Sequence, residues 1–190
     1  MNNMNRGYYF FTPSNMVNAF RKLWEQHGLW TRSFIVSTAA DLPDLEYVTA
    51  RLLRNPSDFV FVLEPFYGEA AGSFEQLLRE HLLIAANLLN HAKNNDAEGY
   101  NEARIAWYSN ADEIAALLAS LNPYWSYSQW RNMLHHHLRL VEEEATLRLL
   151  GKYKEDVELY DTIEEQALEM ADTMSGGIIR QFRLDMNPMR

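Results

Sequence analysis

The stretch Phe20-Arg-Lys-Leu-Trp-Glu-Gln-His27 recurs in altered form twice along the chain, as Phe74-Glu-Gln-Leu-Leu-Arg-Glu-His81 and as Trp130-Arg-Asn-Met-Leu-His-His-His137. Each copy has an aromatic residue, Leu or Met three residues later, and a histidine four residues after that. Spacings of three and four residues place side chains on one face of an α-helix. The copies therefore predict three helices that each carry a histidine on the face turned to the core.

The same periodicity extends over most of the chain and predicts six helices joined by short loops. They run from Pro13 past Phe34, from Leu45 to Phe66 with a kink near Asn55-Pro56, from Gly72-Ser73 to Leu88, from Tyr100 to Leu121, from Ser126 to Glu144 and from Lys154 to Ile179. We expect Gly176-Gly177 to fray the end of the last helix. Short loops favour antiparallel neighbours. We therefore expect an all-α, antiparallel helical bundle that forms a single domain over residues 1–190. The spacing of the histidines divides it into three repeated helical hairpins, at about residues 13–66, 73–121 and 126–180.

Length and composition agree with one globular domain and exclude several classes of partner. The chain has 190 residues, of which 47% are hydrophobic, with only 8 Gly and 6 Pro. Its net charge of −9 argues against a nucleic-acid backbone or an anionic membrane as the main partner. Met1–Tyr9 lacks the apolar segment of a secretory signal, so we expect a cytoplasmic protein. The sequence leaves open whether it forms a homo-oligomer.

Except for Glu144, the candidate functional residues lie close to one level of the predicted bundle. Counting 1.5 Å of rise per residue from each hairpin turn brings the three histidines close to the level of carboxylates on the following helices. Glu144 lies two turns beyond His137 on the same helix face. The candidate ligands are His27, His81, His137, Glu144, Asp58, Asp112 and Asp172.

Two interpretations of this layer stay open. In the first, it binds a divalent metal ion (Fe, Mn, Zn or Ni), because the chain has no cysteine and such sites then use imidazole and carboxylate ligands. Any chemistry would be metal-assisted hydrolysis, transfer or redox at an open coordination position. In the second, the protein is a non-catalytic scaffold or interaction protein. Each buried histidine then hydrogen-bonds a level Asp or Asn and fixes the helix register without a metal.

The sequence assigns no reaction and no catalytic residue. It contains no glycine-rich phosphate loop, no GxSxG nucleophile elbow and no HExxH pair, so kinase and serine-hydrolase chemistry have no support.

Several segments resemble an uncharacterised family of bacilli and related spore-formers. The segments are Trp24–Arg32, Leu42–Asp44, Thr49–Pro56, Pro65–Gly68, Trp107–Ile114, Asn122–Trp125 and Met170–Gly176. Members of that family often carry the label acetylglutamate kinase, but such a kinase needs a parallel sheet and glycine-rich loops that this sequence does not predict. More remotely, the hairpins are similar to ferritin-like and histidine-triad helical-bundle proteins. That resemblance implies a metal, although the Glu-x-x-His pairs of di-iron proteins are missing.

Overall fold

The computed structural model describes residues 12–184, and this part of the chain contains seven α-helices and no strand. Met1–Tyr9, from which we inferred that a secretory signal is lacking, lies outside the described residues. The helices are α1 (Pro13–Ala39), α2 (Leu45–Leu52), α3 (Asn55–Tyr67), α4 (Ala70–Lys93), α5 (Ala97–Leu121), α6 (Tyr127–Leu149) and α7 (Tyr153–Gln181).

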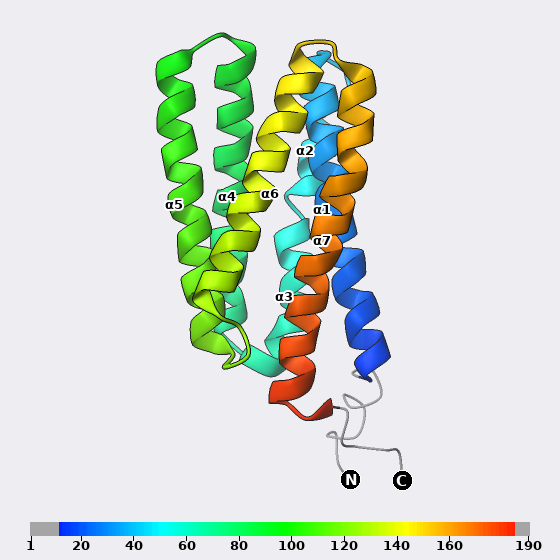
Figure 1. The fold of residues 1–190 in the computed structure, drawn as a ribbon, viewed down its shortest axis with the longest axis vertical. Helices are drawn as coiled ribbons and strands as arrows, with labels where there is room; N and C mark the ends of the chain where they lie inside the picture. Colours follow the sequence, from blue (N-terminus) through cyan, green and yellow to red (C-terminus); the bar gives the residue numbers. More distant parts are fainter. Residues whose placement is uncertain (1–11, 185–190) are drawn as a thin grey trace.

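The helices lie along the long axis of the molecule and alternate in direction (Figure 1). Short α2 and α3 follow one another down the bundle and together make the predicted second helix. Apart from α2 and α3, consecutive helices pack side by side, and α7 closes the bundle by packing on α1. The predicted all-α antiparallel bundle is therefore confirmed, whereas its origin from three repeated hairpins stays a prediction.

The predicted kink near Asn55-Pro56 takes the form of a break between α2 and α3. Proline has no backbone N–H, so Pro56 cannot donate to the carbonyl of Leu52, the last residue of α2. It is well accommodated in the first turn of α3, where a missing donor costs little. The break places Asn55 at the start of α3, where its side chain is fully buried.

The third predicted helix begins earlier than expected, at Ala70 rather than at Gly72-Ser73. Gly68 ends α3 with φ of 56°, a left-handed conformation that favours glycine, and the next helix follows after one further residue.

Three helices, α1, α4 and α6, form the inside of the bundle, since each contacts the other two. Aromatic side chains fill the lower part of the core: the Phe59 ring lies 5.6 Å from that of Phe74, 5.3 Å from that of Trp24 and 6.3 Å from that of Phe20. Phe20 and Phe74 are the aromatic residues that open two copies of the repeated stretch, so the sequence pattern correctly identified core positions.

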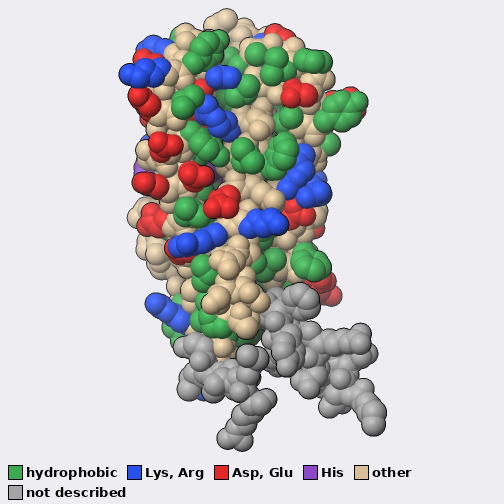
Figure 2. Space-filling view, turned by 90° about the vertical axis from the view of Figure 1, so that its right-hand side faces the viewer, with side chains coloured by type: hydrophobic (Ala, Val, Ile, Leu, Met, Phe, Trp, Pro, Cys, Tyr) green, Lys and Arg blue, Asp and Glu red, His purple; other side chains and the backbone are tan. Residues whose placement is uncertain are grey.

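The face seen in Figure 2 carries acidic and basic side chains interspersed with hydrophobic ones. Within residues 12–184, no helix has both the length and the apolar composition that crossing a membrane requires.

We expected Gly176-Gly177 to fray the last helix, but this prediction is wrong. The helix α7 continues through both glycines to Gln181. The reason is close packing. A Cβ on Gly177 would overlap the indole of Trp125, whose Nε1 donates to the carbonyl of Thr173 at 3.2 Å. Gly176, one residue earlier, has no atom within 4 Å of an added Cβ.

These two glycines make a matched pair for a stability measurement. Gly177→Ala should lower the free energy of unfolding by about 1–3 kcal/mol, because the methyl group displaces the indole and its hydrogen bond. Gly176→Ala should raise it by about 0.5–1 kcal/mol, because alanine loses less backbone entropy in a helix. Urea unfolding of both variants tests the difference, and equal effects would contradict the close approach.

Candidate functional site

The three histidines of the repeated stretch lie on the three inner helices and are almost fully buried. His27, His81 and His137, on α1, α4 and α6, are only 2–3% exposed. The ring centroids of His27 and His137 are 5.6 Å apart. We call these three residues the histidine layer.

Each histidine of the layer is bound by an amide side chain from a neighbouring helix. His27 Nδ1 lies 3.1 Å from Asn55 Oδ1 on α3, and His81 Nδ1 lies 2.8 Å from Asn110 Oδ1 on α5. On α6 and α7 the equivalent pair is His137 Nδ1 and Gln166 Oε1, at 2.9 Å.

The amide nitrogen of each pair donates to a backbone carbonyl on the histidine's own helix. The acceptor always lies four residues before the histidine, at Leu23, Leu77 and Met133, and each distance is 3.1 Å. One amide thus spans one turn of the neighbouring helix. We call this unit of histidine, amide and carbonyl a clamp, and it occurs in the pairs α1–α3, α4–α5 and α6–α7.

The clamp fixes the protonation of each imidazole. A backbone carbonyl only accepts hydrogen bonds, so the amide NH₂ must face it and the amide oxygen must face the histidine. Nδ1 is therefore the protonated nitrogen, and Nε2 carries the lone pair. In the part of the chain that the structure describes, no hydrogen bond reaches Nε2 of His27, His81 or His137.

Burial keeps the three imidazoles neutral. It lowers the pKa of His27 to about 4, against the smaller opposing effect of its hydrogen bond to Asn55. Burial lowers the pKa of His81 to about 3, and the repulsion that a protonated His27 would exert adds to this effect. The pKa of His137 is also lowered to about 3, by burial and then by His27 and His81. At pH 7 the layer therefore presents three uncharged nitrogen donors.

The three predicted aspartate ligands do not join the layer but pair with basic side chains at the surface. Asp58 lies 3.3 Å from Arg54, on the preceding turn. Asp112 is 2.7 Å from His135 and 2.9 Å from Arg131. Asp172 forms a two-pronged pair with Arg21 at 2.6–2.7 Å, which lowers the pKa of its carboxyl.

Glu144 is buried, as the sequence predicted, but it belongs to a separate ion network. Its carboxylate lies 2.5 Å from Arg32, which also binds Asp156 at 2.7 Å. Arg148 is 3.1 Å from Asp156 and completes a network of two arginines and two carboxylates between α1, α6 and α7. Burial raises the pKa of Glu144 to about 7 against the opposing effect of Arg32.

The residues that the sequence analysis did not assign to the site are the amides. They are Asn55, which was predicted only to lie at a kink, Asn110 and Gln166. A signal was present: the three amides follow their histidines by 28, 29 and 29 residues. Asn and Gln are rarely fully buried without partners, so amides at that regular distance point to the clamp.

Comparison with protein-family models, curated proteins and solved structures found no match for this chain. The resemblance to an uncharacterised family of bacilli therefore stays a prediction. Among residues 12–184, no group of three or more His, Asp and Glu side chains is already arranged to hold a metal ion. The layer is thus a set of neutral donors rather than a preformed coordination shell.

The lowered histidine pKa values predict that acid destabilises the fold. Below pH 6.5 the unfolded chain binds up to three protons at these histidines, whereas the folded chain leaves the same histidines unprotonated. The raised pKa of Glu144, about 7, acts in the opposite direction, because there the folded chain binds the extra proton. The net effect is a loss of about 2–3 kcal/mol of unfolding free energy per pH unit near pH 5.5.

Urea unfolding at several pH values between 5 and 7.5 measures this slope. His81→Gln should reduce the slope of unfolding free energy against pH by the contribution of about one proton, roughly 1.4 kcal/mol per pH unit. A stability that stays constant between pH 7 and pH 5 would contradict neutral, buried histidines.

Proposed function

We propose that the histidine layer binds one divalent first-row transition-metal ion through Nε2 of His27, His81 and His137. The observation that carries this proposal is the protonation pattern set by the clamps. Each Nδ1–H is engaged by an amide oxygen, which leaves a neutral imidazole with its lone pair on Nε2. Metal-binding histidines in proteins have this same arrangement, with the second ring N–H donated to a fixed acceptor.

The spacing of the rings supports a shared ion. Two imidazoles bound to one tetrahedral ion, with metal–nitrogen distances of about 2.1 Å, have ring centroids about 5 Å apart. The centroids of His27 and His137 are separated by 5.6 Å, which is close to that distance. His81 influences the pKa of His137, which agrees with its proximity to the same point.

The ligand set narrows the choice of metal. Since Asp58, Asp112 and Asp172 are paired with basic side chains, the layer offers nitrogen donors alone. Imidazole ligands suit Zn, Fe and Ni, whereas Mn prefers carboxylate oxygens. Three protein ligands leave a coordination position open, and a metal held in this way supplies a Lewis acid or a redox centre.

A second candidate function, a scaffold whose polar layer sets the helix register, is favoured by the clamps themselves. In each clamp both the oxygen and the nitrogen of the amide are hydrogen-bonded, so three pairs of helices are connected without a metal. The described residues also form no ready-made metal site. Under this alternative, the histidines would stabilise the fold and bind nothing.

Metal analysis of untagged protein separates the two candidates. After incubation with Zn, Fe(II) or Ni and removal of free metal, the wild-type chain should retain close to one ion per molecule. His81→Gln should lose most of this binding, because glutamine cannot replace the imidazole nitrogen. His135→Gln is the matched control, since His135 pairs with Asp112 outside the layer, and it should bind like the wild type.

Circular dichroism checks that each variant is folded before its metal content is compared. Should His81→Gln not fold, His27→Gln takes its place. Wild-type protein that retains no metal after all three incubations, or equal binding by His81→Gln and wild type, would overturn the metal proposal.

A further inference from the structure

The histidine layer is neutral both in its imidazoles and in the groups that hold them. Burial keeps His27, His81 and His137 uncharged near neutral pH. The Nδ1–H of each ring is accepted by the oxygen of an amide, which is also uncharged. Many metal-binding histidines instead donate this N–H to a carboxylate, which offsets part of the charge of the ion. The clamps of this chain provide no such charge.

The carboxylates that could offset the charge of an ion are engaged elsewhere. The three aspartates that the sequence predicted as ligands pair with basic side chains at the surface. The buried carboxylate of Glu144 is held by Arg32 at 2.5 Å. Within residues 12–184, no acidic side chain is among the groups that shift the pKa of His27 or of His81. The layer therefore lies outside the influence of these carboxylates.

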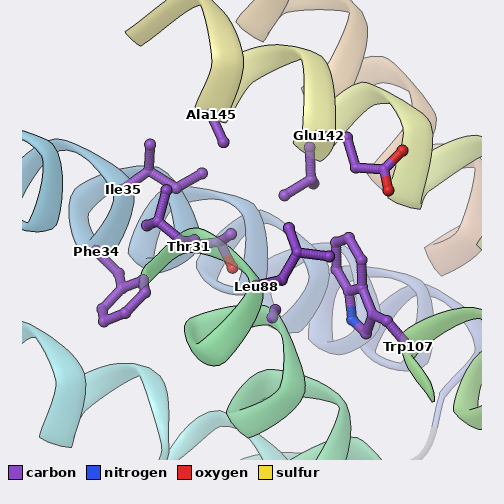
Figure 3. A pocket seen from close by; sticks show the side chains of 10 residues that line it. Thr31, Phe34, Ile35, Leu88, Trp107, Glu142 and Ala145 are labelled. Atoms are coloured by element: carbon purple, nitrogen blue, oxygen red, sulfur yellow. The ribbon is translucent and has the colours of Figure 1, made fainter. Parts of the chain in front are cut away.

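One turn beyond the layer the surroundings are mostly apolar (Figure 3). A small cavity there is lined in part by Thr31, Ala85 and Val141, each of which follows a histidine of the layer by four residues. Glu142 is the one acidic residue among the described residues of the lining, and Arg104 binds its carboxylate at 2.6 Å. Figure 3 shows this carboxylate turned away from the apolar side chains of the lining. This side of the layer therefore supplies no free negative charge either.

A divalent ion in the layer would thus be a buried charge without a counter-charge from the protein. Such a charge is strongly unfavourable in a protein interior unless it is paired. Three histidine ligands leave one coordination position open, and a negative charge can enter there. We infer that the metal ion takes a small anion as its fourth ligand, so that ion and anion occupy the layer together. This inference rests on the proposed function. The anion is small because the three histidines are only 2–3% exposed.

The negative charge has two possible sources. A water bound to the ion loses one proton to the solvent and stays as hydroxide, and zinc in three-histidine sites lowers the pKa of its bound water to about 7. A dissolved anion such as azide instead takes the position of the water, and no proton is released.

Zinc titrations of the untagged protein at about pH 8 test the inference and separate the sources. With hydroxide as the anion, each zinc ion bound in perchlorate, which coordinates metals poorly, releases close to one proton. With a dissolved anion, azide at about ten times its dissociation constant tightens zinc binding by about tenfold relative to perchlorate, without proton release. Either result supports the inference.

The contradicting results differ for the two proposals. Zinc that binds in perchlorate without releasing a proton, and with the same affinity in azide, would overturn the inference and leave the proposed function intact. Absence of zinc binding in both solutions would overturn the proposed function, and this inference with it.

A matched pair of variants tests the charge argument itself. Asn110→Asp places a carboxylate on the Nδ1–H of His81 and so supplies a negative charge inside the layer. Zinc binding by this variant should release fewer protons and depend less on azide than in the wild type. Asp112→Asn is the control and should behave like the wild type, because Asp112 pairs with Arg131 outside the layer.

Circular dichroism shows whether Asn110→Asp is folded. Should it not fold, Gln166→Glu makes the same change at His137. Proton release and azide dependence equal to those of the wild type in the folded variant would overturn the inference.

Discussion

The structure depends on the clamp, in which a histidine and the carbonyl one turn before it share a single amide from the next helix. The amide can satisfy both only in one orientation and at one height, so each clamp fixes the register of a helix pair. Each buried polar group that loses such a partner lowers the free energy of unfolding by about 1–3 kcal/mol. A slip by one turn in any of the three pairs would break two hydrogen bonds at once, and so the clamps select one packing of the bundle.

The same interaction that orders the fold also sets the protonation of the three imidazoles. Because the amide oxygen takes the Nδ1 proton, the Nε2 lone pairs of His27, His81 and His137 stay free. Burial then keeps the rings uncharged near neutral pH. In the proposed function, these three neutral imidazoles would be the ligands of the metal ion.

The fold and the three histidines could be predicted from the sequence because helical periodicity reports which face of each helix is buried. The carboxylates could not, because the count of helix rise gives the level of a residue but not its direction around the helix. Asp112, for example, follows Asn110 by two residues, or about 200° around α5, and so it faces Arg131 and His135 instead of His81. Gly177 was misjudged for a related reason: only packing distinguishes a glycine that ends a helix from one that admits an indole.

The central claim, that the clamps hold all three imidazoles neutral with the proton on Nδ1, is tested most directly by ¹⁵N NMR of the histidine rings at pH 7. The account predicts, for His27, His81 and His137, a protonated Nδ1 coupled to its hydrogen and an unprotonated Nε2. Substituting each histidine in turn assigns the signals. A proton on Nε2, or a doubly protonated ring, at any of the three positions would contradict the account.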